Sequence, residues 1–257
     1  MQKILLLSTL VYSSFALALT GDEVIEIIKK QNKGFGTETS EMVLVLKEGN
    51  SVIAERKMKT KNMESEGDIS MKSLMEFTHP MDVKGTKLLS WLQTKEEKSQ
   101  WVYLPALNKS RRILSSGQNS SFMGSEFTYE DIGGQDTTKH NYKLLSETKD
   151  GKDLIWKVEQ RSKDSENKDY QVLTIKKSLS APTSIEYYNG KKEKMKVSTI
   201  SDFKMYEVNK KQFHRPNLIS MKNLITAKES SFKWEKREFG QSYKDSDFTP
   251  QALDMKR

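Results

Sequence analysis

The chain has 257 residues, a formal net charge of +8 and no cysteine. The lack of cysteine excludes disulfide scaffolds, thiolate metal sites, cysteine nucleophiles and lipid attachment to a cysteine at a signal cleavage point. A basic surface suits nucleic acid, anionic headgroups or acidic partners. Nucleic-acid binding would require exposed aromatic residues among the basic ones, or a known module. Neither appears, so we expect no nucleic-acid partner.

The first 18 residues have the features of an export signal. Lys3 gives a positive start, and residues 4–11 form an apolar run too short to span a bilayer. Ala16 and Ala18 have the spacing that suits signal peptidase. A buried N-terminal helix is the alternative interpretation. We predict a signal peptide over residues 1–18 and a single β domain over residues 19–257, whose net charge without Lys3 falls from +8 to +7.

Helical periodicity is confined to the start of this domain. Residues 22–32 are predicted to form a helix, because Val24, Ile27 and Ile28 share one face. Short segments of strand character follow. In chain order they are residues 42–47, 52–61, 69–77, 87–94, 100–104, 142–147, 154–161, 170–176, 184–189, 195–203, 218–227 and 231–239.

Turn signals and alternation favour an antiparallel meander for these segments. Asn189-Gly190 stands between two of them, and both residues tolerate the positive φ of a tight hairpin. Residues 69–77 alternate most clearly, with Met71, Met75 and Phe77 on one face. The sequence therefore predicts a mainly β fold, without the strand–helix alternation of a parallel sheet.

Residues 105–135 interrupt the meander. This stretch is rich in Ser, Asn and Gly but contains Phe122, Met123, Phe127 and Tyr129. A disordered linker would contain few such residues. We therefore predict a long ordered loop that lies across the sheet with apolar contacts of its own.

No catalytic or metal-binding pattern stands out. The three histidines are far apart in sequence and lack paired-ligand spacing, and Ser125 lacks the GxSxG context of an exposed nucleophile. Glu126, Glu130 and Asp131 could form an acid/base pair, although a solvated acidic turn or a partner for Arg111 and Arg112 is the simpler interpretation. We expect no enzymatic activity, no metal and no cofactor.

The methionines offer a further hint. Met71, Met75, Met195 and Met205 fall in strand-like segments, and this flexible side chain suits surfaces that accept varied apolar ligands. Core packing is the default interpretation for each of them. A curved sheet with few helices must still bury its apolar face, and a ligand can supply part of that burial.

A central run of residues resembles a known family. Residues 101–113 read WVYLPALNKSRRI and residues 120–131 read SSFMGSEFTYED. The segments VKGTKLL at 83–89, SMKN at 220–223 and DFTP at 247–250 extend the match over most of the chain. Together they resemble the LolA-like outer-membrane lipoprotein-sorting proteins, in the branch associated with RND-type transporters.

The resemblance implies a fold, a compartment and a role. The fold would be a single curved antiparallel sheet forming an incomplete, half-open β-barrel, with short helices and a loop as lid over a hydrophobic cavity. The protein would work in the periplasm of a Gram-negative bacterium, as a monomer, and carry lipid or the acyl chains of lipoproteins beside an inner-membrane RND-type exporter. The cavity or lid residues would be Trp91, Trp101, Tyr103, Leu104, Phe122, Met123, Phe127, Tyr129, Met71 and Met75, with Arg111 and Arg112 contacting a headgroup, a partner or nearby carboxylates.

Two other functions stay open at this point. The chain could be an accessory module that docks on an envelope transporter through the loop, without carrying cargo. It could also be a hydrolase of envelope lipid that uses Ser125, which the sequence supports least. The nature of the cargo, free lipid or lipoprotein, does not follow from the sequence.

Overall fold

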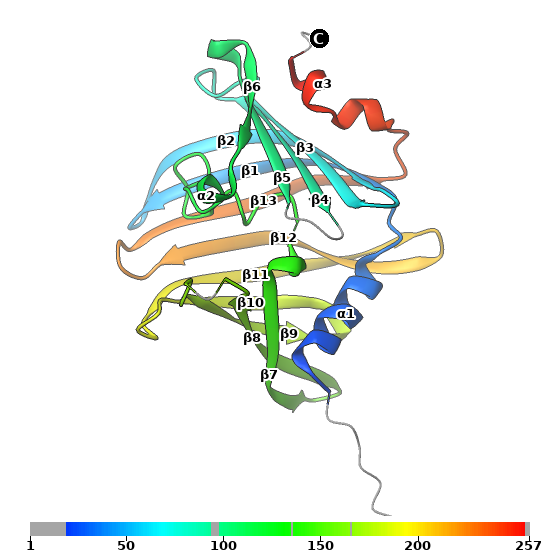
Figure 1. The fold of residues 1–257 in the computed structure, drawn as a ribbon, viewed down its shortest axis with the longest axis vertical. Helices are drawn as coiled ribbons and strands as arrows, with labels where there is room; N and C mark the ends of the chain where they lie inside the picture. Colours follow the sequence, from blue (N-terminus) through cyan, green and yellow to red (C-terminus); the bar gives the residue numbers. More distant parts are fainter. Residues whose placement is uncertain (1–18, 94–97, 135, 165, 255–257) are drawn as a thin grey trace, which may run out of the picture.

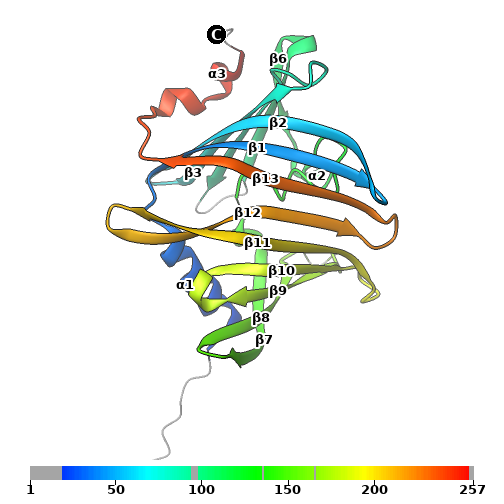
Figure 2. The same ribbon diagram turned by 180° about the vertical axis from the view of Figure 1, so that it is seen from behind.

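Thirteen strands form one antiparallel sheet in the computed structural model, which describes residues 19–93, 98–134, 136–164 and 166–254. The sheet is strongly curved around a concave face, which looks toward the viewer in Figure 1 and away in Figure 2. The strands are β1 (Thr37–Glu48), β2 (Ser51–Glu64), β3 (Ile69–His79), β4 (Lys87–Gln93), β5 (Ser99–Leu104), β6 (Lys109–Ile113), β7 (His140–Asp150), β8 (Asp153–Ser162), β9 (Tyr170–Lys176), β10 (Ala181–Tyr188), β11 (Lys194–Val208), β12 (Lys211–Asn223) and β13 (Lys228–Phe239).

Two meanders build this sheet. Its order is β6-β5-β4-β3-β2-β1-β13-β12-β11-β10-β9-β8-β7, so the halves join where β1 pairs with β13 and the two edges are β6 and β7. Because β6 and β7 follow one another in sequence, residues 114–139 must run from one edge of the sheet to the other. This connecting segment lies on the concave side (Figure 1). The sheet is not closed, and the predicted half-open, mainly β architecture is confirmed.

The helices are few and short. They are α1 (Gly21–Asn32), α2 (Ser115–Gln118), α3 (Pro250–Asp254) and the 3-10 turns η1 (Pro105–Leu107), η2 (Thr137–Lys139), η3 (Lys177–Leu179) and η4 (Asp245–Phe248). None of the helices in the described ranges is long and apolar enough to cross a membrane. The predicted signal peptide, residues 1–18, lies outside these ranges.

The predicted helix is confirmed as α1, and its boundaries have local causes. Thr20 and Glu23 form a capping box, in which each side chain accepts from the other residue's backbone N–H. Val24 and Ile25 are buried and pack in one cluster with Trp156 and Val158 of β8. The helix therefore covers the concave side of the sheet near the β7 edge, as Figure 1 shows.

Each of the twelve predicted segments overlaps an observed strand, while β6 was missed. Residues 218–227 cover only the second half of β12 and continue into the turn after it, so the bounds predicted for that strand were wrong. The sequence of β6, KSRRI, has neither a clear alternation nor a run of β-branched residues, and four of its five residues are polar. It forms because it adds to β5 as the last strand, with Leu104 opposite Lys109. An edge strand with charged side chains is a common way to end a sheet without inviting aggregation. The predicted loop therefore begins after β6 rather than at Pro105.

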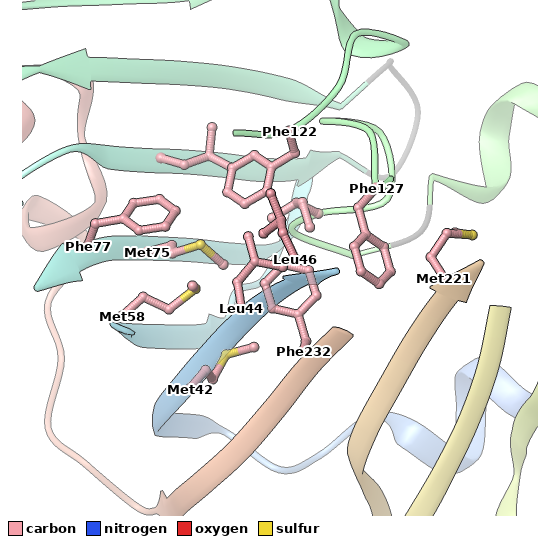
Figure 3. Close-up of a cluster of buried hydrophobic side chains, with 12 residues drawn as sticks. Met42, Leu44, Leu46, Met58, Met75, Phe77, Phe122, Phe127, Met221 and Phe232 are labelled. Atoms are coloured by element: carbon pink, nitrogen blue, oxygen red, sulfur yellow. The ribbon is translucent and has the colours of Figure 1, made fainter. Parts of the chain in front are cut away.

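The main core lies between the connecting segment and the central strands. Figure 3 shows Phe122 and Phe127 of the segment facing Met42 and Leu44 of β1 and Phe232 of β13. A second group lies on the convex side, where the C-terminal turn η4 and helix α3 cover β3, β4 and β5. There Phe248 and Leu253 pack with Leu89 and Tyr103, and Trp91 donates its indole N–H to the Phe248 carbonyl at 2.7 Å.

Candidate ligand-binding cavity

A cavity of about 440 Å³ opens within the concave face, between the connecting segment and strands β2, β3 and β10–β13. We call it the central cavity. Most of its wall is apolar, with a minority of polar groups. Its lining includes Thr60, Asn62, Met71, Ser73, Met75, Phe127, Ile132, Pro182, Ile185, Tyr187, Ser198, Ile200, His214, Arg215, Ile219, Met221, Phe232 and Trp234.

Strand alternation supplies this wall. Every second residue of a strand points to the same face of the sheet. Ser198 and Ile200 of β11 therefore both line the cavity, while Thr199 between them is exposed. Met71, Ser73 and Met75 follow the same rule along β3. The sequence places apolar and small residues at these positions, which leaves space between them.

The connecting segment closes one side of the cavity through an aromatic cluster. The Phe122 ring lies 5.9 Å from Phe77, 5.4 Å from Tyr129 and 6.3 Å from Phe232, measured between ring centroids. Phe127 lies 4.8 Å from Phe232 and also lines the cavity. Aromatic pairs at these separations stabilise beyond their burial alone. The segment is therefore held in place by packing at its centre.

Hydrogen bonds fix the same segment at its outer end. Arg56 of β2 donates to the carbonyl of Met123 at 2.6 Å. Glu126 donates its backbone N–H to Ser230 of β13, and its carboxylate accepts from Asn223 of β12 at 2.8 Å. Met123 itself has φ of 51°, in the left-handed region that non-glycine residues seldom adopt. The FMGSE turn is thus shaped by contacts to three separate strands.

Lys98 fixes the inner end of the segment. The residue is 2% exposed, and its ammonium donates to the carbonyls of Glu130 at 2.6 Å, Ile132 at 2.9 Å and Gly134 at 3.1 Å. Burial lowers the pKa of Lys98 to about 8, and the nearby carboxylate of Glu130 counteracts part of that shift. Lys98 thereby ties residues 130–134, which form part of the cavity wall, to the start of β5.

A second cavity of about 610 Å³ lies on the other side of this wall, and we call it the polar cavity. It is lined mainly by polar and charged residues of the connecting segment and of β8–β11, including Glu126, Asp136, Lys139, Gln160, Asp169 and Lys196. Asp131, Gly134, Ile185, Tyr187 and Met221 line both cavities. The hydroxyl of Tyr187 donates to Asp131 at 3.3 Å, and burial raises the pKa of this tyrosine. An apolar space and a polar space therefore share one thin wall.

The sequence-predicted site residues fall into three places. Met71, Met75 and Phe127 line the central cavity, and Phe122, Met123 and Tyr129 belong to or pack against the cluster beside it. Trp91, Trp101 and Tyr103 lie on the convex face, packed with Phe248 under the C-terminal segment. These three therefore do not line the cavity, because the register of β4 and β5 turns them outward. Leu104 is half-buried at the end of β5.

The two arginines also lie away from the cavities. Arg112 donates to the hydroxyl of Ser99 at 3.1 Å and lies over the ring of Trp101, and Arg111 is exposed on β6. The acidic residues have other partners: Glu126 lies 3.8 Å from Lys196, and Asp131 accepts from Thr128. Within the described ranges, no group of three His, Asp or Glu side chains is arranged to hold a metal ion.

The sequence analysis missed the half of the wall that comes from the C-terminal meander. Ile185, Ile200, Ile219 and Trp234 each line the cavity from a different strand among β10–β13. All four lie in segments that were predicted as strands. Their alternation was the available signal, but it does not tell which face of a strand turns inward. That choice depends on the curvature of the whole sheet.

The fold and its cavity define this chain as an open β half-barrel with an apolar interior. Comparisons with known proteins agree. The chain is similar to a domain from Vibrio parahaemolyticus named as an outer membrane lipoprotein-sorting protein, with a TM-score of 0.83 and 30% identity over 91% of this chain and 98% of that domain. The chain belongs to the family of outer-membrane lipoprotein-sorting proteins.

Other comparisons support the fold. A DUF1329 family protein from Desulfovibrio piger aligns with a TM-score of 0.79 and 24% identity, covering 91% of this chain and 97% of that one. A LolA superfamily protein from Nitrosomonas europaea aligns with a TM-score of 0.66 and 17% identity, covering 90% and 98%. A family model described as an uncharacterized protein matches residues 70–255. No curated protein matches the chain.

Proposed function

We propose that this protein is a periplasmic carrier that binds lipid, or the acyl chains of a lipoprotein, in the central cavity and transfers them without chemical change. The observation that carries the proposal is the cavity itself. On the same concave face the connecting segment fills the space over β1–β4 with Phe122 and Phe127, whereas about 440 Å³ beside them stays open between largely apolar walls. Membership in a family of lipoprotein-sorting proteins supports the same role.

The size and chemistry of the cavity suit an acyl chain. Ligand pockets in proteins commonly measure about 300–1,000 Å³, and the central cavity lies within this range. Each methylene group that leaves water gains about 0.8 kcal/mol. Methionine side chains such as Met71, Met75 and Met221 can adapt to chains of different shape. Binding therefore requires no specific polar contact to the tail.

The compartment and the partner are part of the proposal. The export signal predicted over residues 1–18 would deliver the chain to the periplasm, where lipoproteins pass between the two membranes. Work beside an RND-type exporter remains a prediction from the sequence resemblance. A non-carrier role as a docking module is the alternative that the following experiments exclude or favour.

The first experiment identifies the cargo. Protein purified from the periplasm is measured by native mass spectrometry, and bound material is extracted and identified. We expect a co-purifying lipid or acylated peptide in the carrier. A protein that is empty and also ignores added acyl-chain probes would contradict the proposal and favour the docking role.

The second experiment locates the binding site. Ile200 lines the cavity, and its neighbour Thr199 points to the exposed face of the same strand. Ile200→Asp should weaken binding of anthroyloxy-labelled palmitate at least about tenfold, because loss of an apolar contact and a new charge each cost more than 1 kcal/mol. Thr199→Asp should bind as the wild type does.

A filling variant guards against loss of folding. Ala181 lies at the start of β10 and lines the cavity. Ala181→Trp occupies the space without placing a charge in it, so it should also reduce binding of the labelled palmitate. Circular dichroism spectra equal to the wild type would show that both variants fold. Unchanged binding in both variants would place the ligand elsewhere.

A further inference from the structure

Exposed aliphatic side chains gather at two neighbouring hairpin tips. Val52 and Ile53, after the β1–β2 turn, are 56% and 54% exposed. Leu224 and Ile225, in the β12–β13 turn, are 43% and 67% exposed. Both hairpin turns lie at the same end of the strands, because Glu48 at the end of β1 pairs with Lys228 at the start of β13. The two hairpin tips that carry these residues are therefore adjacent, and both are at the left in Figure 1.

Other turns lie at the same end of the strands, and we define the tip rim as residues 47–57, 80–86, 105–109, 189–194 and 222–228. The β3–β4 and β5–β6 turns, at the top in Figure 1, are set back from the β1–β2 tip, because His79 at the end of β3 pairs with Lys57 of β2. Met81 and Leu107 stand on it, at 78% and 51% exposure. Their turns are in contact, since a side chain at Gly85 would meet Pro105 at 3.2 Å. Six of the ten large hydrophobic side chains that are exposed within the described residues belong to the rim. At the opposite end of the sheet, the β11–β12 hairpin exposes Met205.

The tip rim also concentrates positive charge. It contains ten basic residues and four acidic ones, a difference of +6, against +8 for the whole chain. The basic residues are Lys47, Arg56, Lys57, Lys84, Lys109, Lys191, Lys192, Lys194, Lys222 and Lys228, and the acidic ones are Glu48, Glu55, Asp82 and Glu193. The β8–β9 loop lies at the same end of the strands and has two basic residues (Lys163, Lys168) and three acidic ones (Asp164, Glu166, Asp169). The difference for the whole end is therefore +5.

We propose that the tip rim docks on the surface of an anionic lipid bilayer. Val52, Ile53, Leu224 and Ile225 would enter the headgroup region, while the surrounding lysines would contact lipid phosphates. Aliphatic side chains flanked by lysines are typical of proteins that lie on a membrane, and each basic residue near an anionic surface adds attraction. Protein–protein interfaces, by contrast, favour aromatic residues and Arg and are poor in Lys, whereas nine of the ten basic residues here are lysines.

The polar cavity reaches the same rim. Tyr188 and Met195, which line it, flank the hairpin tip between β10 and β11. A bilayer on the rim would therefore face the polar cavity, which shares the wall of Asp131 and Tyr187 with the central cavity. Docking at the rim goes beyond the proposed carrier function and does not depend on it.

Sedimentation with vesicles tests the proposal. Vesicles of phosphatidylethanolamine and phosphatidylglycerol in equal parts are compared with vesicles of phosphatidylcholine alone. The wild type should bind the anionic vesicles, bind them less at high salt, and bind the zwitterionic ones poorly. The double variant Ile53→Asp/Ile225→Asp should lose about tenfold or more in binding, because two inserted aliphatic groups are replaced by charges.

The control variant is Met205→Asp, which changes an equally exposed side chain (56%) at the other end of the sheet. It should bind vesicles as the wild type does. Lys191→Gln/Lys192→Gln should weaken binding at low salt and reduce the salt dependence. All these positions are exposed, so the folding of each variant is not at risk.

Three outcomes would overturn the proposal. They are a wild type that ignores anionic vesicles, an equal loss in Met205→Asp, or a protein complex that the rim variants disrupt while vesicles are never bound. The rim variants should keep wild-type binding of anthroyloxy-labelled palmitate. A wild type that binds anionic vesicles but no palmitate would contradict the carrier function alone, and one that binds palmitate but no vesicles would contradict docking alone, so the two proposals can be told apart.

Discussion

Replacement of Lys98 by methionine tests how the inner wall of the cavity is held. Methionine has a similar length but no charge, so Lys98→Met removes the ammonium that contacts the carbonyls of Glu130, Ile132 and Gly134. Burial lowers the pKa of Lys98 from 10.5 to about 8. Between these two pH values the unfolded chain binds more protons at this site than the folded chain does. The free energy of unfolding contributed by Lys98 must therefore rise with pH across this window.

The magnitude follows from the two pKa values. At pH 7 the lysine is charged in both states, and the folded state bears the full cost of burying the charge. At pH 9.5 it is neutral in the folded protein and still mostly charged in the unfolded chain. The free energy of unfolding of the wild type, relative to Lys98→Met, should therefore increase by about 2 kcal/mol from pH 7 to pH 9.5.

Urea unfolding at the two pH values measures this difference, because residues common to both proteins titrate alike and cancel. The control, Lys84→Met, removes an exposed lysine, so we expect it to respond to pH as the wild type does. A difference between wild type and Lys98→Met that stays constant with pH would refute the reasoning. It would mean that the three carbonyls stabilise the charged form enough to offset its burial.

Three further predictions concern stability. Glu38→Ala should lower the free energy of unfolding, measured in urea, by about 3–5 kcal/mol, because it leaves the buried Arg237 guanidinium, 3.0 Å away, without its carboxylate. The control Glu41→Ala removes a half-exposed partner of a surface ion pair and should lower the free energy of unfolding by less than about 1 kcal/mol. Phe248→Ala should destabilise the C-terminal segment that covers the convex face by about 3–5 kcal/mol. Limited proteolysis should then cut faster near the C-terminus. The control Gln251→Ala, at an exposed position, should leave the rate of proteolysis unchanged. Phe122→Ala should speed hydrogen exchange of the amides in the connecting segment while β1 stays protected. The faster amides should include that of residue 122, whose N–H donates to the Phe127 carbonyl. Equal acceleration in β1 would contradict a local role.

The sequence carried most of the fold because strand alternation and turn residues act locally. Asn189-Gly190 marks the turn after β10, and Val24, Ile27 and Ile28 have the spacing of one helix face in α1, so both elements could be placed without tertiary information. β6 could not, because its five residues form a strand through pairing with β5 rather than through any preference of their own.

The site was predicted only in part, for a physical reason. Alternation shows that Trp101 and Tyr103 share one face of β5, but both faces of this strand are covered. The connecting segment covers one face, where Gln100 donates to the carbonyl of Tyr129, and Phe248 covers the other. Aromatic residues are equally suited to either cover. Phe127 could be assigned to the cavity side because it belongs to the segment that crosses the concave face. The apolar residues of that segment had indicated an ordered loop across the sheet.

The position of the cavity is set by the two segments that cover the concave face, the connecting segment and helix α1. The N-terminal meander ends at one edge, and the chain must return across the concave face to begin the second meander at the other edge. As it crosses, the chain packs Phe122 and Phe127 over β1–β4. Helix α1 covers β7–β9 on the same concave face, near the opposite edge of the sheet, through Val24 and Ile25. Neither cover extends over the middle of β10–β13, so the inward side chains there, such as Ile200, face open space. A longer α1 or a bulkier connecting segment would close that space and remove the apolar cavity on which the proposed carrier function depends.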